Sequence, residues 1–162
     1  MDKQHEQLRF YLSSGDRVGI ATLRRDGFAS VGSPEETRGA TLLTVPLTFH
    51  TNKTALFLNI RGGGVSRVDV LAPTMASDPK LLLSMVEGIP SDTDSTMMEV
   101  KLRAGAVANL AALRGKPFRL SIKLGAKARL YAFWLSEGSG GQSGGWLGAG
   151  GPAYPGGLRD VY

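Results

Sequence analysis

The sequence predicts an all-β fold, namely a two-sheet antiparallel β-sandwich of the jelly-roll or concanavalin-like kind with about nine strands. Apolar and polar residues alternate over many short stretches, which is typical of strands with one buried face. Glycine, aspartate, asparagine and serine separate these stretches at short intervals, as in sandwiches and barrels. A chain of 162 residues is long enough to bury one core without cross-links.

The alternation defines inward faces in three strands. In Pro117–Leu124 the apolar face consists of Phe118, Leu120, Ile122 and Leu124. In Thr96–Leu102 it consists of Met98, Val100 and Leu102, and in Thr41–Phe49 of Leu43, Val45, Leu47 and Phe49. Side chains two apart share a face of a strand, so each set is expected to point into the core.

Six further strands follow from apolar runs between turn residues: Leu8–Ser13, Arg17–Arg24, Gly27–Val31, Ala55–Ile60, Val65–Leu71 and Arg129–Ser136. The Asp26-Gly27 pair predicts a tight hairpin between the strands on either side, because these residues adopt the positive φ angles that such turns need. Two segments carry helical signals, and we expect short helical turns in loops at Asp78–Val86 and Ala104–Leu113. For Leu81–Val86 a buried strand is an open alternative.

Composition divides the chain into three parts. Residues 1–7 are polar and are expected to form a flexible N-terminus, and residues 8–137 form the predicted sandwich domain. Residues 138–162 form a glycine-rich tail that begins with a linker-like run. Trp146 and other apolar residues interrupt this tail, so docking on the domain and disorder are both open.

Composition excludes several classes of site. Without cysteine, the chain has no disulfide, no thiolate metal site and no cysteine nucleophile. The N-terminus lacks the apolar run of a signal peptide, and no stretch is apolar enough to span a membrane, so the compartment stays unassigned. The net charge is +5, but basic residues come singly or as one pair, which predicts a solvated basic surface and neither a nucleic-acid nor a membrane partner.

Three patches in order resemble one family. The first is Arg17–Ser30. The second is Gly39–Phe49 followed by Ala55–Ile60, and the third is Leu113–Leu120 through Ala128–Leu135. Asp94-Ser95-Thr96 adds a smaller match. Together they resemble the C-terminal end of glycoside-hydrolase-like proteins in which a five-bladed β-propeller precedes a β-sandwich. Within the first patch, Gly19–Phe28 resembles the hinge between the two domains, and Leu8–Leu12 resembles the last propeller strand. The propeller, with its catalytic carboxylates, would lie upstream of Leu8.

This resemblance implies a non-catalytic accessory sandwich with a structural, docking or oligomerisation role. Its partner would be a propeller domain, or a second copy bound through an apolar face. The acidic residues agree with a chain that is not an enzyme, because nearly all fall in turns or on polar strand faces and no spacing favours a catalytic pair.

The alternative function is a carbohydrate-binding, lectin-like module that stacks exposed aromatic rings on a glycan. The candidate residues are Tyr131, Phe133, Trp134 and Trp146. On a regular strand, Tyr131 and Phe133 point one way and Trp134 the other. One set therefore faces the core, and the other is available to a ligand or to a covering segment.

Asp92 and Asp94 are the only candidate metal ligands that the sequence suggests. The run Asp92-Thr93-Asp94-Ser95 gathers oxygen atoms that suit calcium. A complete EF-hand loop counted from Asp92 would need a glutamate at position 103, where the chain has Arg103. A polar loop whose side chains bond their own backbone is the alternative, and no other cofactor is expected.

Overall fold

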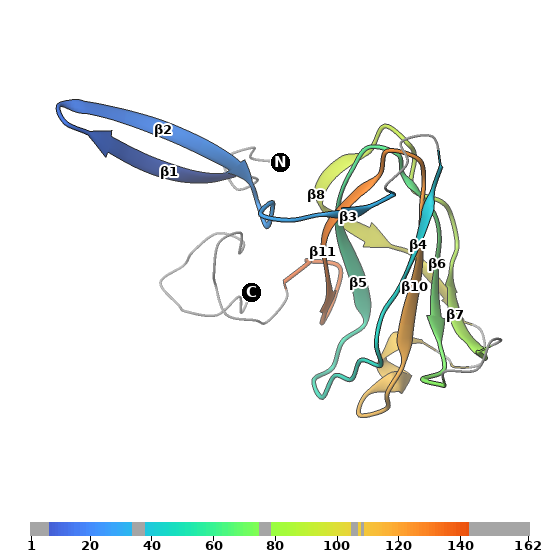
Figure 1. The fold of residues 1–162 in the computed structure, drawn as a ribbon. Coiled ribbons are helices and arrows are strands. Elements are labelled where there is room, and N and C mark those ends of the chain that lie inside the picture. The colour runs from blue at the N-terminus through green and yellow to red at the C-terminus, as the bar shows by residue number, and fades with distance from the viewer. Residues whose placement is uncertain (1–6, 34–37, 75–78, 105–106, 108, 143–162) are drawn as a thin grey trace.

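The computed structural model describes residues 7–33, 38–74, 79–104, 107 and 109–142. These residues form a two-sheet antiparallel β-sandwich, with a separate two-stranded hairpin projecting from it (Figure 1). The predicted fold class is confirmed. No helix in this part of the chain is long and apolar enough to cross a membrane.

The hairpin consists of β1 (Gln7–Ser14) and β2 (Arg17–Arg24), which pair over all eight residues without a register shift. Gly15 has a φ of +61°, and Asp16, which follows it, does not have a positive φ. A two-residue loop with glycine in this position is typical of a type II′ turn, whose twist matches that of the flanking strands. The two strands were predicted correctly, but they lie outside the sandwich.

The sandwich contains nine strands among the described residues, in two sheets. The five-stranded sheet has the order β4-β10-β6-β7-β9, and the four-stranded sheet has the order β3-β11-β5-β8. In the first sheet these strands are β4 (Ala40–Leu43), β10 (Arg119–Leu124), β6 (Val65–Leu71), β7 (Leu81–Met85) and β9 (Leu102–Ala104). In the second they are β3 (Val31–Gly32), β11 (Arg129–Ser136), β5 (Ala55–Arg61) and β8 (Asp94–Val100).

The core lies between the two sheets and is built by alternating residues of the central strands. Leu56, Leu58 and Ile60 of β5 are fully buried and belong to the core. From the facing sheet, the predicted inward set Phe118, Leu120, Ile122 and Leu124 is at most 3% exposed. The alternation in Pro117–Leu124 therefore predicted this part of the core correctly.

Glycines allow the chain to cross between the sheets. Gly62, Gly63 and Gly64 connect β5 to β6 and have φ angles of +61°, +61° and +66°. A Cβ on Gly63 would lie 2.1 Å from the backbone nitrogen of Ala128 in the loop that precedes β11. Because the two crossings are packed backbone to backbone, no larger residue fits at Gly63.

The two regions with helical signals have different outcomes. The helical turn expected within Asp78–Val86 is wrong, since β7 is a strand, which confirms the open alternative for Leu81–Val86. Burial explains the outcome, because Leu83 and Met85 alternate into the core while β7 pairs with β6 and β9. In Ala104–Leu113, a short 3₁₀ helix (η2, Leu110–Leu113) confirms the expected helical turn, and the Asn109 side chain caps it.

The predicted strand Thr41–Phe49 is too long, and its face is partly wrong. The chain leaves the regular ladder after Leu43 and touches it again where Leu47 bridges to Phe118. Leu43 and Val45 are 46% and 72% exposed, whereas Leu42 and Leu47 pack against the core. A shift of one residue in register exchanges the two faces of a strand, which is why the prediction failed on this side.

One strand prediction and one turn prediction are each correct in part. The inward face of Thr96–Leu102 is confirmed, but the chain changes sheets at Lys101, so that Met98 and Val100 lie on β8 and Leu102 on β9. The turn at Asp26-Gly27 exists, with Asp26 at φ +52° and the Gly27 N–H donating to the Arg24 carbonyl at 2.8 Å. The hairpin predicted there is wrong, because β2 pairs with β1 and β3 pairs with β11.

Candidate functional site

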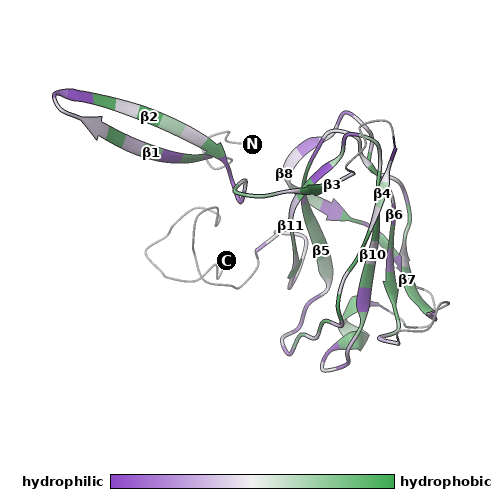
Figure 2. Cartoon of the chain, in the orientation of Figure 1, coloured by the Kyte–Doolittle hydropathy of each residue, from purple (hydrophilic) through white to green (hydrophobic). Residues whose placement is uncertain are grey.

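The β1–β2 hairpin exposes apolar side chains on both of its faces. The register places Leu8, Phe10, Leu12, Ala21 and Leu23 on one face. On the other face, Tyr11, Val18 and Ile20 are 71%, 75% and 62% exposed. Apolar segments lie within both strands of the projecting hairpin (Figure 2). A sheet with two apolar faces is typical of one that is covered on both sides.

The hairpin also has two open edges. Each strand has one side that pairs with no other described strand, so alternate backbone N–H and C=O groups point outward along eight residues. Natural proteins block such edges with proline, lysine, bulges or very short strands. β1 has none of these features, and Arg9 is its one charged residue. The edge of β1 is therefore available to pair with another strand.

Arg24 joins the hairpin to the sandwich. Its Nε donates to Oδ1 of Asn59 at 2.7 Å, and its second terminal nitrogen donates to the Ile60 carbonyl at 3.0 Å. The first terminal nitrogen forms an ion pair with Asp94 on β8. The guanidinium carbon lies 5.1 Å from the centroid of the Tyr131 ring, within cation–π distance. We call Arg24, Asn59, Asp94 and Tyr131 the Arg24 joint.

Asn59 is the buried half of the joint. It is fully buried on β5, accepts from Arg24 and donates its side-chain amide to the Arg25 carbonyl at 2.6 Å. A buried amide that loses its partners costs stability, so these bonds hold the end of β2 in one place on the sandwich. The joint therefore fixes where the hairpin leaves the domain.

Charge also gathers around the joint. Asp94 receives a second cation, since Arg61 Nε lies 3.6 Å from its other carboxylate oxygen.

Next to the joint, burial raises the pKa of Asp26 above its ordinary value of 3.8, and the Arg25 guanidinium opposes part of this increase. The folded chain therefore holds the Asp26 proton more tightly than the unfolded chain does.

A β-bulge separates the predicted aromatic site residues. The ladder between β11 and β5 shifts register between Leu130 and Ala132, which leaves Tyr131 as the extra residue. Phe133 packs against the core, while Tyr131 lies under Arg24. The expectation that Tyr131 and Phe133 share a face is wrong, because the bulge breaks the period of two.

Trp134 is covered by the chain itself. Its ring stacks on Phe57 with centroids 5.7 Å apart and an angle of 15° between the planes. Its Nε1 donates to the Gly141 carbonyl at 2.7 Å, so the start of the glycine-rich tail lies over the outer face of the four-stranded sheet. Trp146 lies outside the described residues.

The two aspartates proposed as calcium ligands have different surroundings. Asp92 lies in the turn before β8, and Asp94 begins β8 and binds the guanidinium groups of the Arg24 joint. In the part of the chain that the structure describes, no group of three or more His, Asp or Glu side chains is placed to hold a metal ion. The calcium site therefore stays a prediction.

A small pocket opens where β8 and β9 meet η2. It has a volume of about 210 Å³ and is lined by Thr54, Ala55, Leu83, Glu99, Val100, Lys101, Leu102, Asn109 and Leu110. Lys101 Nζ and a Glu99 carboxylate oxygen form an ion pair at 2.7 Å within it. Sites for small molecules usually measure about 300 to 1,000 Å³, so this pocket is too small to enclose a drug-sized ligand.

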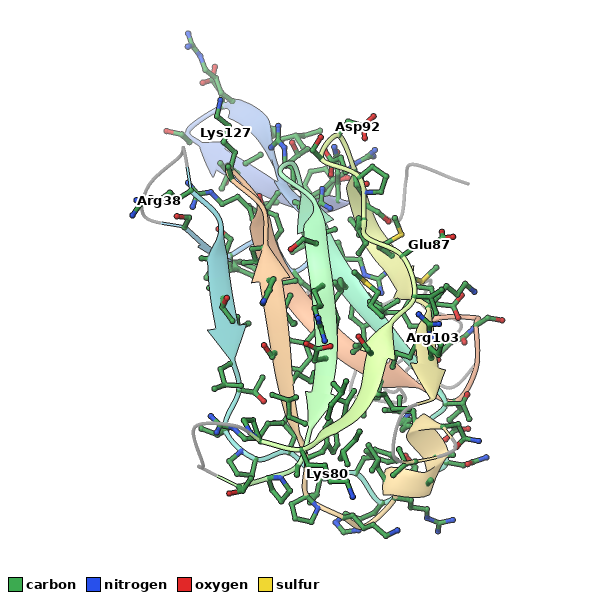
Figure 3. The ribbon with its side chains drawn as sticks, turned by 90° about the vertical axis from the view of Figure 1, so that its right-hand side faces the viewer. Arg38, Lys80, Glu87, Asp92, Arg103 and Lys127 are labelled. Atoms are coloured by element: carbon green, nitrogen blue, oxygen red, sulfur yellow. The ribbon has the colours of Figure 1, made fainter. Side chains whose placement is uncertain are left out.

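The outer face of the five-stranded sheet is polar. At its centre Asp69, which is 8% exposed, accepts from Arg67 Nε at 2.7 Å and from Ser84 Oγ at 2.8 Å. Figure 3 views this face and labels charged side chains spread around its rim: Arg38, Lys80, Glu87, Asp92, Arg103 and Lys127. Both signs of charge occur around the rim, as expected for a solvated surface.

Arg24 and Asn59 were not among the site residues predicted from the sequence. Asn59 interrupts the otherwise apolar run Ala55–Ile60, and a polar residue inside a buried strand requires a hydrogen-bond partner. This signal predicts that Asn59 forms a buried hydrogen bond, but its partner lies 35 positions away on another element. Only the fold identifies Arg24 as that partner.

Comparison with known proteins adds no relative, since no protein-family model, no curated protein and no solved structure matches this chain.

Proposed function

We propose that this chain is a non-catalytic accessory β-sandwich that docks onto a partner through the β1–β2 hairpin. The observation that carries the proposal is the exposure of apolar residues on both hairpin faces together with two open edges. An isolated two-stranded hairpin is marginal in water, whereas a sheet of three or more strands is stable. The hairpin therefore gains stability when another strand joins it.

The sandwich provides the contrast that supports this proposal. Its core is complete without the hairpin, because the core residues come from the loops and strands after β2. Its outermost strands β3, β4 and β9 have only two, four and three residues, and β8 carries a register shift. These are the usual protections of sheet edges, and the hairpin has none of them.

The family resemblance supports the same role. The stretch that resembles a hinge between propeller and sandwich, Gly19–Phe28, contains Arg24, the residue through which the hairpin contributes to the Arg24 joint. A joint that holds a projecting β-hairpin on a sandwich suits a domain attached to another β-rich body. A propeller domain or a second copy of the chain is the partner class that follows.

The charged residues support a non-catalytic role. Glycoside hydrolysis needs two carboxylates at a sugar-binding cleft, one of them free to exchange a proton. Asp69 is paired with Arg67, Asp94 with Arg24 and Arg61, and Glu99 with Lys101. Carboxylates engaged in such ion pairs suit structural use.

The lectin-like alternative is not favoured by a particular contact. Phe133 contributes to the core, Trp134 is stacked on Phe57 and bound to Gly141, and Tyr131 lies under Arg24. Each of these rings has a partner inside the chain. A glycan array with the purified protein tests this alternative, and specific binding of one glycan class would revive it.

Sedimentation tests the docking function. The full chain is run alone at increasing concentration and mixed with a five-bladed propeller domain of the resembled family. The matched variants are Ile20→Lys on the hairpin and Lys123→Ala on the sandwich. We expect association, with itself or with the propeller, that Ile20→Lys abolishes and Lys123→Ala leaves unchanged. A strictly monomeric chain without affinity for the propeller contradicts the proposal.

A further inference from the structure

We infer that the hairpin binds a second copy of this chain, with β1 pairing antiparallel to β1 of the other copy around a two-fold axis at Phe10. This inference rests on the proposed docking function and adds the identity of the partner. It follows from the residues along β1, whose order is complementary to itself.

The register follows from the faces of β1. Residues directly opposite each other in a sheet lie on the same face, so an even-numbered residue of β1 must face another even-numbered one. With Phe10 on the axis, Phe10 faces Phe10 of the second copy and Leu8 faces Leu12. On the other face Arg9 faces Tyr11. Every large side chain of this strand then has a suitable neighbour.

The only charge on β1 is compatible with this register. An axis at Phe10 places the Arg9 guanidinium beside the Tyr11 ring of the other copy, which avoids two arginines directly opposite each other. The chain already uses this kind of contact at the Arg24 joint, where Arg24 lies over Tyr131. Phe10 likewise already forms an edge-to-face contact, with its ring centroid 6.4 Å from that of Phe28.

The edge of β2 is less suitable for the same purpose. An axis at Ile20 would place Gly19 opposite Ala21 and Arg17 opposite Leu23, so that few large side chains meet. Gly19 has no atom within 4 Å of a Cβ built on it, and glycine weakens a strand. Arg24 is already bound to the sandwich at the end of this strand. The β1 edge therefore offers the better pairing surface.

Pairing of two hairpins produces a four-stranded antiparallel sheet in the order β2-β1-β1-β2. Its backbone groups are satisfied along the shared edge, and Leu8, Phe10 and Leu12 of both copies form one continuous apolar face. This sheet passes the size at which antiparallel sheets become stable. Arg24 of each copy holds the hairpin at a fixed place on the sandwich of the same copy.

A cysteine scan tests the axis, because the natural chain has no cysteine. Opposite residues of an antiparallel ladder have Cα atoms about 4.5 to 5.5 Å apart, within the range of disulfides. Phe10→Cys is therefore expected to give a disulfide-linked dimer under mild oxidation. Leu12→Cys serves as the control, because each introduced thiol would lie about 14 Å from its symmetry mate. Stacking of the hairpins face to face would hold the two sites about 10 Å apart and prevent the Phe10→Cys link.

A charge exchange tests the same register without cysteine. Tyr11→Lys places a lysine opposite Arg9 of the other copy at two symmetric positions. We expect the dissociation constant of the dimer to rise at least about tenfold. Combining it with Arg9→Glu converts both positions to opposite charges and is expected to restore the dimer. Lys123→Ala on the sandwich is again the control and is expected to leave the dimer unchanged.

The outcomes separate the inference from the proposed function. A dimer that links through Phe10→Cys and follows the charge exchange supports the inference. A chain that stays monomeric but binds a propeller through the hairpin overturns it and leaves the docking function standing. A dimer that links only through another position, such as Tyr11→Cys or Ile20→Cys, overturns this axis. A dimer that survives Ile20→Lys, Tyr11→Lys and loss of Phe10 overturns both.

Discussion

The hairpin and the sandwich use similar residues for opposite purposes. Ile122 in the sandwich is completely buried, while Ile20 in the hairpin is 62% exposed, although both lie on six- to eight-residue antiparallel strands. The edges of the sandwich are short or carry a register shift, while the hairpin leaves eight residues open on each side. The difference teaches that the sandwich satisfies its own chain, while the hairpin is shaped for contact with another.

The largest expected difference in stability is between alanine substitutions of a buried isoleucine in the sandwich and an exposed one in the hairpin. Ile122→Ala removes a buried side chain between the sheets and is expected to lower the free energy of unfolding by about 4 kcal/mol. Ile20→Ala is expected to change it by less than about 0.5 kcal/mol, because the side chain is mostly in water. Urea denaturation of dilute protein measures both. Equal losses would show that the hairpin is part of the cooperative fold.

Matched glycines give the next effect. Gly63→Ala would place a Cβ 2.1 Å from a backbone nitrogen at a φ of +61°, and we expect a loss of about 3 kcal/mol. Gly19→Ala on β2 meets open space at an ordinary φ, so the free energy of unfolding should stay within about 0.5 kcal/mol. Thermal unfolding checks the pair. An unchanged melting temperature for Gly63→Ala would contradict the packed crossing of the two loops.

The Arg24 joint connects the two regions, and we expect its loss to make the hairpin more mobile. Arg24→Met keeps the apolar stem but removes the donors to Asn59 and Ile60, with an expected cost of about 2 kcal/mol. We also expect lower NMR order parameters throughout β1 and β2. Arg61→Met is the control, since Arg61 binds the same Asp94 from an exposed position. If both variants left the hairpin equally ordered, the joint would not position it.

The smallest effect concerns Asp26 beside the joint. Burial raises its pKa when the chain folds, so the folded state binds this proton more tightly than the unfolded state. The Asp26 contribution to the free energy of unfolding therefore falls as pH rises from its ordinary value of 3.8 through the raised value, and stays low above it. Asp26→Asn should slightly raise the melting temperature at neutral pH and remove this part of the pH dependence. A melting temperature that falls at neutral pH would contradict the burial cost.

The sequence predicted the sandwich better than the hairpin for a physical reason. Alternation reports which side of a strand is buried, so the core set on β10 and the inward faces of Met98 and Val100 were predicted correctly. The same signal in Leu8–Ser13 and Arg17–Arg24 does not reveal whether a core exists to receive those side chains. Alternation also fails where one residue is inserted, as at the Tyr131 bulge, or where the chain leaves its ladder, as after Leu43.

The candidate site was harder to predict than the fold. Tyr131 and Asp94 were selected as sugar and calcium ligands, and the structure places both around Arg24. Asp94 lies 70 positions from Arg24 along the chain, and Tyr131 lies farther still. No local pattern encodes such a contact. Asn59, isolated in an apolar strand, was the one residue whose burial required a polar partner.

Hydrogen exchange resolved by residue, measured on the full chain at low and at high concentration, tests the central claim most directly. We expect the amides of β5 and β10 to exchange slowly and equally at both concentrations, because the sandwich is complete in one copy. Outward-facing amides of β1 should exchange rapidly in dilute protein and become protected at high concentration, with those of β2 changing less. Protection of β1 that does not depend on concentration, or exposure that persists at every concentration, would contradict docking of the hairpin on a second copy.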